Sequence, residues 1–191
     1  MSHPLRRFAA LASLLLPVPL AASEAPASAP QTVYLATVVD TSHVSPRGAS
    51  MPIRVRLDRL TSDERVAELV GIAHEKGEPA LRRALAGEAL GRLEIDGRLG
   101  DPITYARRIE DADGAHLLLV ALRSVSIREV FGSRRSVDYP FTVVQIDLDD
   151  AGHGGGAYYG VARVRPQKDG EIEVDGLGIL PDRLLAVRAA G

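Results

Sequence analysis

Cysteine is absent from the 191-residue chain, and aromatic residues make up only 4% of it. The absence of cysteine excludes disulfides, thiolate zinc sites, a cysteine nucleophile and a lipid-modified N-terminal cysteine. The low aromatic content disfavours a sugar site lined by aromatic rings and a large aromatic interface. The chain also has no excess of basic residues, because it contains 23 Lys and Arg residues and 25 Asp and Glu residues. We therefore expect no nucleic-acid partner.

Long apolar stretches are missing outside the N-terminus, where residues 8–20 form one apolar run. Arg6 and Arg7 precede this run, and the small residues 21–23 follow it. This order is typical of a secretory signal peptide. A membrane-spanning helix needs about 20 apolar residues, and this run is shorter and is interrupted by two prolines.

The organisation of the chain follows from that pattern. We predict a signal peptide at residues 1–22, with cleavage between Ala21 and Ala25, and an Ala/Ser/Pro-rich spacer at residues 23–30. A single domain is expected at residues 31–191, where the mixture of apolar and charged residues is typical of globular proteins. The mature protein is expected to be exported, periplasmic or secreted, and to have no membrane span.

Several segments alternate apolar and charged residues, which predicts strands with one solvated face. These segments are residues 53–58, 92–96 and 171–175. Other segments are more continuously apolar, which is typical of strands covered on both faces. They are residues 32–39, 116–122 and 141–148. Short turn signals, several of them Asp-Gly pairs, separate these runs and indicate antiparallel neighbours.

Between the second and third expected strands, the apolar residues change to helical spacing. Residues 61–64 match a capping box, in which the Thr61 hydroxyl is expected to accept from the Glu64 amide. The pattern continues to Gly77, and Pro79 fits the first turn of a second helix. We therefore predict an α+β fold: a mostly antiparallel curved sheet or barrel-like meander with one helical hairpin inserted after the second strand.

Two motifs near residue 150 are similar to functional loops. Residues 153–156 read His-Gly-Gly-Gly, as in the oxyanion hole of some esterases, but the chain has no G-x-S-x-G nucleophile elbow. Residues 147–152 are similar to the start of a calcium loop, but Tyr158 stands where an EF-hand requires glutamate. We interpret residues 149–156 as a hairpin turn, and we expect no metal and no cofactor.

Two arginine pairs, Arg107-Arg108 and Arg134-Arg135, have the guanidinium groups that bind carboxylates and phosphates. Adjacent residues of a strand face opposite sides, so only one member of each pair can enter a given site. Charged side chains are mostly exposed in folded proteins, which favours solvated arginines here.

The candidate binding site is the segment before Phe141, with Arg134, Asp138 and Tyr139. Arg134 and Asp138 carry opposite charges and are expected to form a local ion pair that fixes how the chain joins the sheet. Tyr139 precedes Pro140, whose ring keeps it extended. The extended backbone therefore fixes the direction of the Tyr139 side chain, which points into the core or over a pocket mouth. A structural role is preferred to a binding role.

Residues 134–142 read Arg-Arg-Ser-Val-Asp-Tyr-Pro-Phe-Thr, and the glycine-rich residues 152–156 follow. Together with residues 60–65 and 105–107, this pattern resembles a family of small exported bacterial proteins of uncharacterised function. The resemblance implies an exported, strand-rich domain and brings no activity with it.

The leading hypothesis is a non-catalytic exported domain that binds a small molecule or a protein partner. A curved antiparallel sheet closed by helices can hold an apolar ligand, as small barrels do. The alternative is a hydrolase that uses His116 or His153 with Asp138 or Glu129. Those groups must converge in a pocket to be catalytic, and no catalytic residue is assigned on sequence alone.

Overall fold

The computed structural model describes residues 31–41, 50–112, 114–123, 138–166, 172–176 and 180–190. Within these ranges the chain forms nine strands and two helices. They are, in chain order, β1 (Thr32–Val39), β2 (Ser50–Leu57), α1 (Asp63–Lys76), α2 (Glu78–Leu85), β3 (Gly91–Ile95), β4 (Pro102–Asp111), β5 (Gly114–Leu122), β6 (Phe141–Leu148), β7 (His153–Pro166), β8 (Ile172–Gly176) and β9 (Asp182–Ala190).

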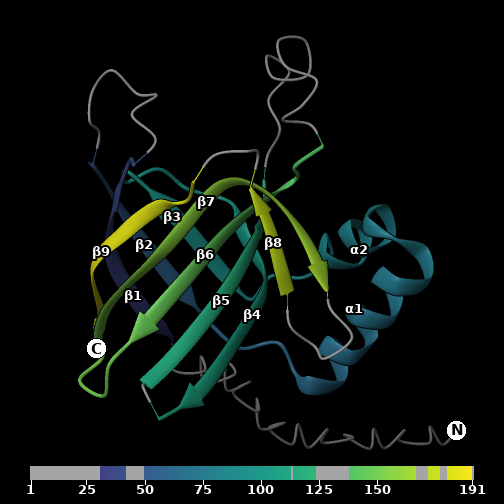
Figure 1. Cartoon of the computed structure of the whole chain (residues 1–191), viewed down its shortest axis with the longest axis horizontal. Helices are drawn as coiled ribbons and strands as arrows, with labels where there is room; N and C mark the ends of the chain where they lie inside the picture. Colours follow the sequence, from purple (N-terminus) through teal and green to yellow (C-terminus); the bar gives the residue numbers. More distant parts are fainter. Residues whose placement is uncertain are drawn as a thin grey trace, which may run out of the picture.

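Eight of the described strands form a closed antiparallel barrel (Figure 1). Each strand from β1 to β6 pairs with the next, and β9 pairs with both β7 and β1, which completes the ring. The remaining described strand, β8, pairs with the C-terminal half of β7 outside the ring. The expected antiparallel, barrel-like sheet is confirmed. The described chain is mostly β, with two helices beside the barrel.

Strand β7 approaches the backbone of its neighbours closely at its glycines. A Cβ atom on Gly154 would collide with the carbonyl oxygen of Asp147, and one on Gly156 with that of Gln145. The pairing of β7 with β9 also shifts register between Gly154 and Gly156. Glycines are typical of such close backbone approaches and bulges. The expectation of a hairpin turn across residues 149–156 is therefore wrong for His153–Gly156, which begin β7.

Apolar side chains fill the interior of the barrel. Along β5 the inward residues alternate regularly, at Ala115, Leu117, Leu119 and Ala121. The other fully buried interior residues are Tyr34, Val38, Ile53, Val55, Leu57, Leu90, Leu93, Ile103, Ala106, Val144, Ile146, Leu148, Tyr158, Leu184 and Val187. The interior is thus a packed core, as in other small barrels.

A second apolar core lies on the outside of the barrel, beneath the two helices. It consists of Val66, Leu69, Leu81, Leu85, Tyr105, Val120, Phe141, Val143, Ala162 and Val164. Figure 1 shows α1 and α2 side by side at one flank of the barrel. This core covers the outer faces of β5 and β6 at Val120, Phe141 and Val143, as their mostly apolar sequences predict, whereas the side chains of His116 and Asp147 on the same faces are exposed. The expectation fails for β1, whose outward side chains are only half-buried and lie away from the two described helices.

Helix α1 is capped one residue later than the capping box predicts. The Ser62 hydroxyl accepts from the amide of Arg65 at 3.3 Å. The Thr61 hydroxyl instead accepts from the amide of Ala106 on β4 at 3.0 Å. Thr61 therefore joins the helical segment to the barrel. Neither α1 nor α2, the helices of the described ranges, has the length and apolar character needed to cross a membrane.

We expect Gly154→Ala to lower the free energy of unfolding by about 2 kcal/mol or more, because the added methyl group collides with backbone that cannot move cheaply. The matched control is Gly87→Ala in the turn after α2, where an added Cβ meets no atom within 4 Å. This control should change stability by less than about 0.5 kcal/mol. Urea denaturation of the two variants measures both effects, and equal stabilities would contradict the role assigned to Gly154.

Candidate functional site

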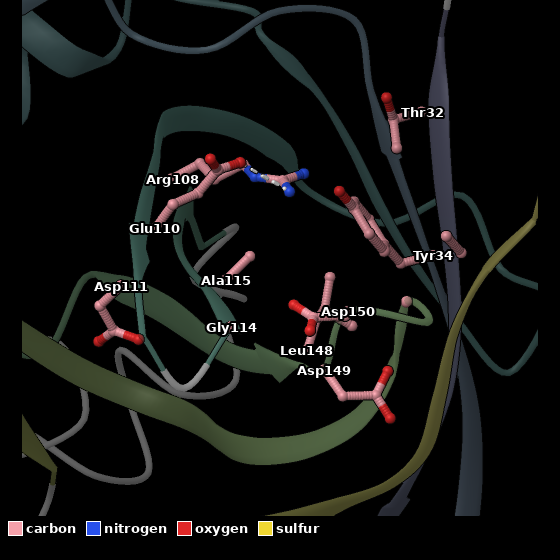
Figure 2. Close-up of a pocket in the computed structure, with 12 residues that line it drawn as sticks. Thr32, Tyr34, Arg108, Glu110, Asp111, Gly114, Ala115, Leu148, Asp149 and Asp150 are labelled. Carbon is pink, nitrogen blue, oxygen red and sulfur yellow. Dashed lines mark ion pairs between the residues drawn. The ribbon is translucent and has the colours of Figure 1, made fainter.

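A cavity of about 360 Å³ opens at one end of the barrel, where the β4–β5 and β6–β7 hairpins turn (Figure 2). Strands β1, β4, β5, β6 and β9 and the β6–β7 turn contribute its walls. The lining residues are Thr32, Tyr34, Arg108, Glu110, Asp111, Gly114, Ala115, Leu148, Asp149, Asp150, Gly152 and Ala189. We call this cavity the barrel mouth.

Arg108 projects into the barrel mouth from β4. The strand places Ala106 in the apolar interior, so Arg108 and Glu110 face the same side two and four residues further along. The Arg108 Nη2 atom lies 2.9 Å from the Glu110 Oε1 atom, and 40% of the Arg108 side chain is exposed. As strand geometry requires, one member of the Arg107-Arg108 pair faces the cavity. It is Arg108, which stays exposed to solvent as expected while it lines the cavity.

Tyr34 lies opposite Arg108, on β1. Its side chain is only 4% exposed, and Figure 2 shows the Arg108 guanidinium extending across the cavity toward the Tyr34 hydroxyl. Burial raises the pKa of Tyr34, and the charge and hydrogen bonding of Arg108 lower it by a smaller amount. The phenol therefore stays protonated at neutral pH: its oxygen accepts from Arg108, and its O–H remains a second donor beside the guanidinium.

Four carboxylates line the cavity around these donors, and they differ in their hydrogen-bond and ion-pair partners. Asp149 Oδ1 accepts from the backbone amides of Ala151 and His153, both at 2.9 Å, which shapes the β6–β7 turn. Glu110 pairs with Arg108. Within the described ranges, the Asp150 side chain has neither a hydrogen bond nor an ion pair. One arginine against Glu110, Asp111, Asp149 and Asp150 gives 1 − 4 = −3, so the lining is acidic.

His116 joins two carboxylates on the outer side of the same barrel end. Its Nδ1 atom lies 2.7 Å from Asp147 Oδ1, and its Nε2 atom lies 3.1 Å from Asp111 Oδ2. The hydrogen bond to Asp147 is the largest cause that raises the pKa of His116, and Asp111 adds to it. Both ring nitrogens are thus engaged with carboxylates, which leaves neither available as a general base.

The residues named for the alternative hydrolase do not come together in the described structure. His153 is exposed at the start of β7, and His116 is bonded to Asp111 and Asp147. Neither histidine forms a hydrogen bond or ion pair with Asp138 in the described ranges. Glu129 lies outside the described residues. The hydrolase hypothesis requires these side chains to converge in one pocket. The described ones, His116, His153 and Asp138, do not.

The candidate binding residues lie away from the barrel mouth, as far as they are described. Tyr139 is half-buried, and the Arg163 guanidinium carbon lies 4.8 Å from the centre of its ring. The Arg163 Nε atom donates to the Asp138 carbonyl oxygen at 2.6 Å and lies 3.7 Å from the Glu78 carboxylate. These contacts connect the segment before β6 with β7 and α2. Arg134 lies outside the described residues, so its expected ion pair with Asp138 stays a prediction.

A second cavity, of about 310 Å³, lies near the start of α1. Its arginines are already paired, since Arg65 lies 2.7 Å from Glu68 and 3.2 Å from Glu88, and Arg59 lies 3.5 Å from Glu88. Its Thr61 hydroxyl bonds to the backbone of β4. This cavity therefore holds structural contacts. The described residues also include no group of three His, Asp or Glu side chains placed to hold a metal ion.

The His116 bridge predicts a specific pH dependence of stability. The folded-state pKa lies above the ordinary value of 6.5, so the stabilisation is fully present below that value and is lost as the pH rises through the folded pKa. We expect the melting temperature of wild type to exceed that of His116→Gln at about pH 5.5, and the difference to shrink by about pH 8.5. Thermal melts across this range measure it. A difference that grows with pH would contradict the bridge.

Comparison of the chain with protein-family models, with curated proteins and with solved structures gave no match. The resemblance of residues 134–142 and 152–156 to a family of exported proteins therefore stays a prediction. The chemistry of the barrel mouth is the strongest guide to what the protein does.

Proposed function

We propose that the chain is an exported, non-catalytic protein that binds a small polar molecule in the barrel mouth. One observation carries the proposal: Arg108 extends from β4 into a cavity of about 360 Å³, opposite the buried Tyr34. A cavity of this size is within the range of small-molecule sites, which combine apolar walls with a few convergent polar groups. The mouth has both, because Ala115 and Leu148 line it beside the two donors.

The packing of the barrel favours a polar ligand over an apolar one. Side chains such as Leu93, Ile103 and Leu119 are at most 1% exposed and occupy the interior. A long apolar ligand would need that volume. A ligand at the mouth instead meets Arg108 and the acidic lining. The sequence allowed an apolar ligand inside the barrel. We therefore propose a polar ligand at the mouth instead.

A binding role is favoured over catalysis by the composition of the lining. A hydroxyl nucleophile is activated by an adjacent general base, most often a histidine. The mouth has the Thr32 and Tyr34 hydroxyls, but its lining includes no histidine and no lysine. Burial also keeps Tyr34 protonated. The donors and carboxylates present are suited to reversible recognition of a polar molecule.

Export is supported by the arrangement of residues 1–23, with two arginines, an apolar run and small residues. We expect the protein recovered from the periplasm or the medium to begin at a residue from Ala22 to Ala25, after cleavage between Ala21 and Ala25. N-terminal sequencing of that material tests this expectation. An intact Met1 terminus on cytosolic protein would overturn the export part of the proposal and leave the binding part standing.

Binding at the mouth predicts a strong dependence on Arg108. We expect Arg108→Ala to abolish the retention of a small molecule through purification, measured by native mass spectrometry, and the melting shift produced by that molecule. Arg54→Ala is the matched control, because Arg54 also pairs with one glutamate, at 3.5 Å, but on the outer face of β2. The control should bind as wild type does. Equal binding by all three proteins would place the ligand elsewhere.

A further inference from the structure

We infer that the ligand of the barrel mouth is a small zwitterion, specifically an α-amino acid with an aliphatic side chain. This inference rests on the proposed function and names the class of ligand for that same site. Each of the three parts of such a molecule has a counterpart in the lining: donors for the carboxylate, carboxylates for the ammonium group and apolar surface for the side chain.

The carboxylate fits the two donors that face each other across the mouth. A guanidinium has five N–H groups, and Arg108 uses only some of them, on Glu110 at 2.9 Å and on the Tyr34 hydroxyl. The pair with Glu110 is exposed, and exposed pairs contribute little to stability, so a ligand can share or displace it cheaply. Tyr34 adds a protonated hydroxyl. Planar guanidinium groups bind carboxylates with two parallel hydrogen bonds.

The ammonium group fits the acidic remainder of the lining. The net charge of −3 would oppose a ligand that carries only a carboxylate. Asp150 is unpaired within the described ranges, and Glu110 is 71% exposed, so both can turn toward a ligand. Asp149 is held by turn amides and Asp111 by His116, and these two contribute through their charge.

The side chain of the ligand fits the apolar part of the walls. Ala115, Leu148 and Ala189 come from three different strands, and Tyr34 of β1 lines the cavity with them. An aliphatic group is suited to such surfaces, and the volume of about 360 Å³ is sufficient for one amino acid. A simple amine would gain no interaction with Arg108 or Tyr34, and a simple acid would be repelled by the net charge of −3. The zwitterion uses both kinds of group.

The test compares three molecules that share one hydrocarbon skeleton. Leucine has both charges, 3-methylbutylamine lacks the carboxylate, and 4-methylpentanoate lacks the ammonium group. Isothermal titration calorimetry on the full mature protein should give leucine a Kd at least about tenfold lower than either analogue, because losing a charged hydrogen-bond partner is strongly unfavourable. Binding of either analogue as tightly as leucine would overturn the zwitterion assignment.

Variants assign each end of leucine to its partner. Arg108→Gln and Tyr34→Phe should weaken leucine without weakening 3-methylbutylamine, which Arg108→Gln should bind more tightly because a positive charge is lost, whereas Asp150→Asn should weaken both. Arg54→Gln on the outer face should change neither. Circular dichroism melts establish that each variant is folded, and Asp150→Asn alters an exposed turn residue, so it keeps the test informative if another variant is destabilised.

The outcomes separate this inference from the proposed function. If none of the three probes binds, but a molecule retained through purification depends on Arg108, the zwitterion class is wrong and the binding site stands. If leucine binds and Arg108→Gln has no effect on its Kd, the placement in the mouth is wrong. If no retained molecule and no probe depends on Arg108, both proposals fail.

Discussion

The close approach of β7 to β6 and β9 is the constraint on which the rest of the structure depends. The barrel closes only because the first half of β7 pairs with both strands at once. At Gly154 and Gly156, any side chain would collide with the carbonyls of β6. Closed sheets have no free edges, and closure also separates an inside from an outside. Both cores of the protein follow from that separation.

Closure also creates the barrel mouth. Strands β4, β6 and β9 end at the same rim where β1, β5 and β7 begin, so residues far apart in the chain become neighbours there. Tyr34 and Arg108 face each other because β1 and β4 lie on opposite sides of that rim (Figure 2). The same rim places His116 next to Asp147 on the adjacent strand β6. The helices, by contrast, cover only the outer face and leave the mouth open.

The strands and helices were largely predictable from sequence, because period-two and helical patterns report which face of a segment is buried. The site was much less predictable. Arginine at position 108 has the same local signature as an arginine on an outer face, and only ring closure turns its face of β4 toward the cavity. The helix cap was misplaced by one residue, because Thr61 has a tertiary partner on β4 that no local pattern reveals. The glycines at 154–156 looked like a turn because close backbone approach and tight turning both require residues without a side chain.

The sequence of inward residues on β4 also marks how deep water reaches into the barrel. Ala106 is fully buried, whereas Arg108 and Glu110, further along the same face, are charged and partly exposed. A charge at the depth of Ala106 would be desolvated without compensation, which is far more unfavourable than an exposed ion pair. The apolar interior and the polar mouth are therefore two parts of one gradient along β4. A ligand that binds at its boundary meets apolar surface on one side and fixed charges on the other, which is the environment that an amphipathic small molecule requires.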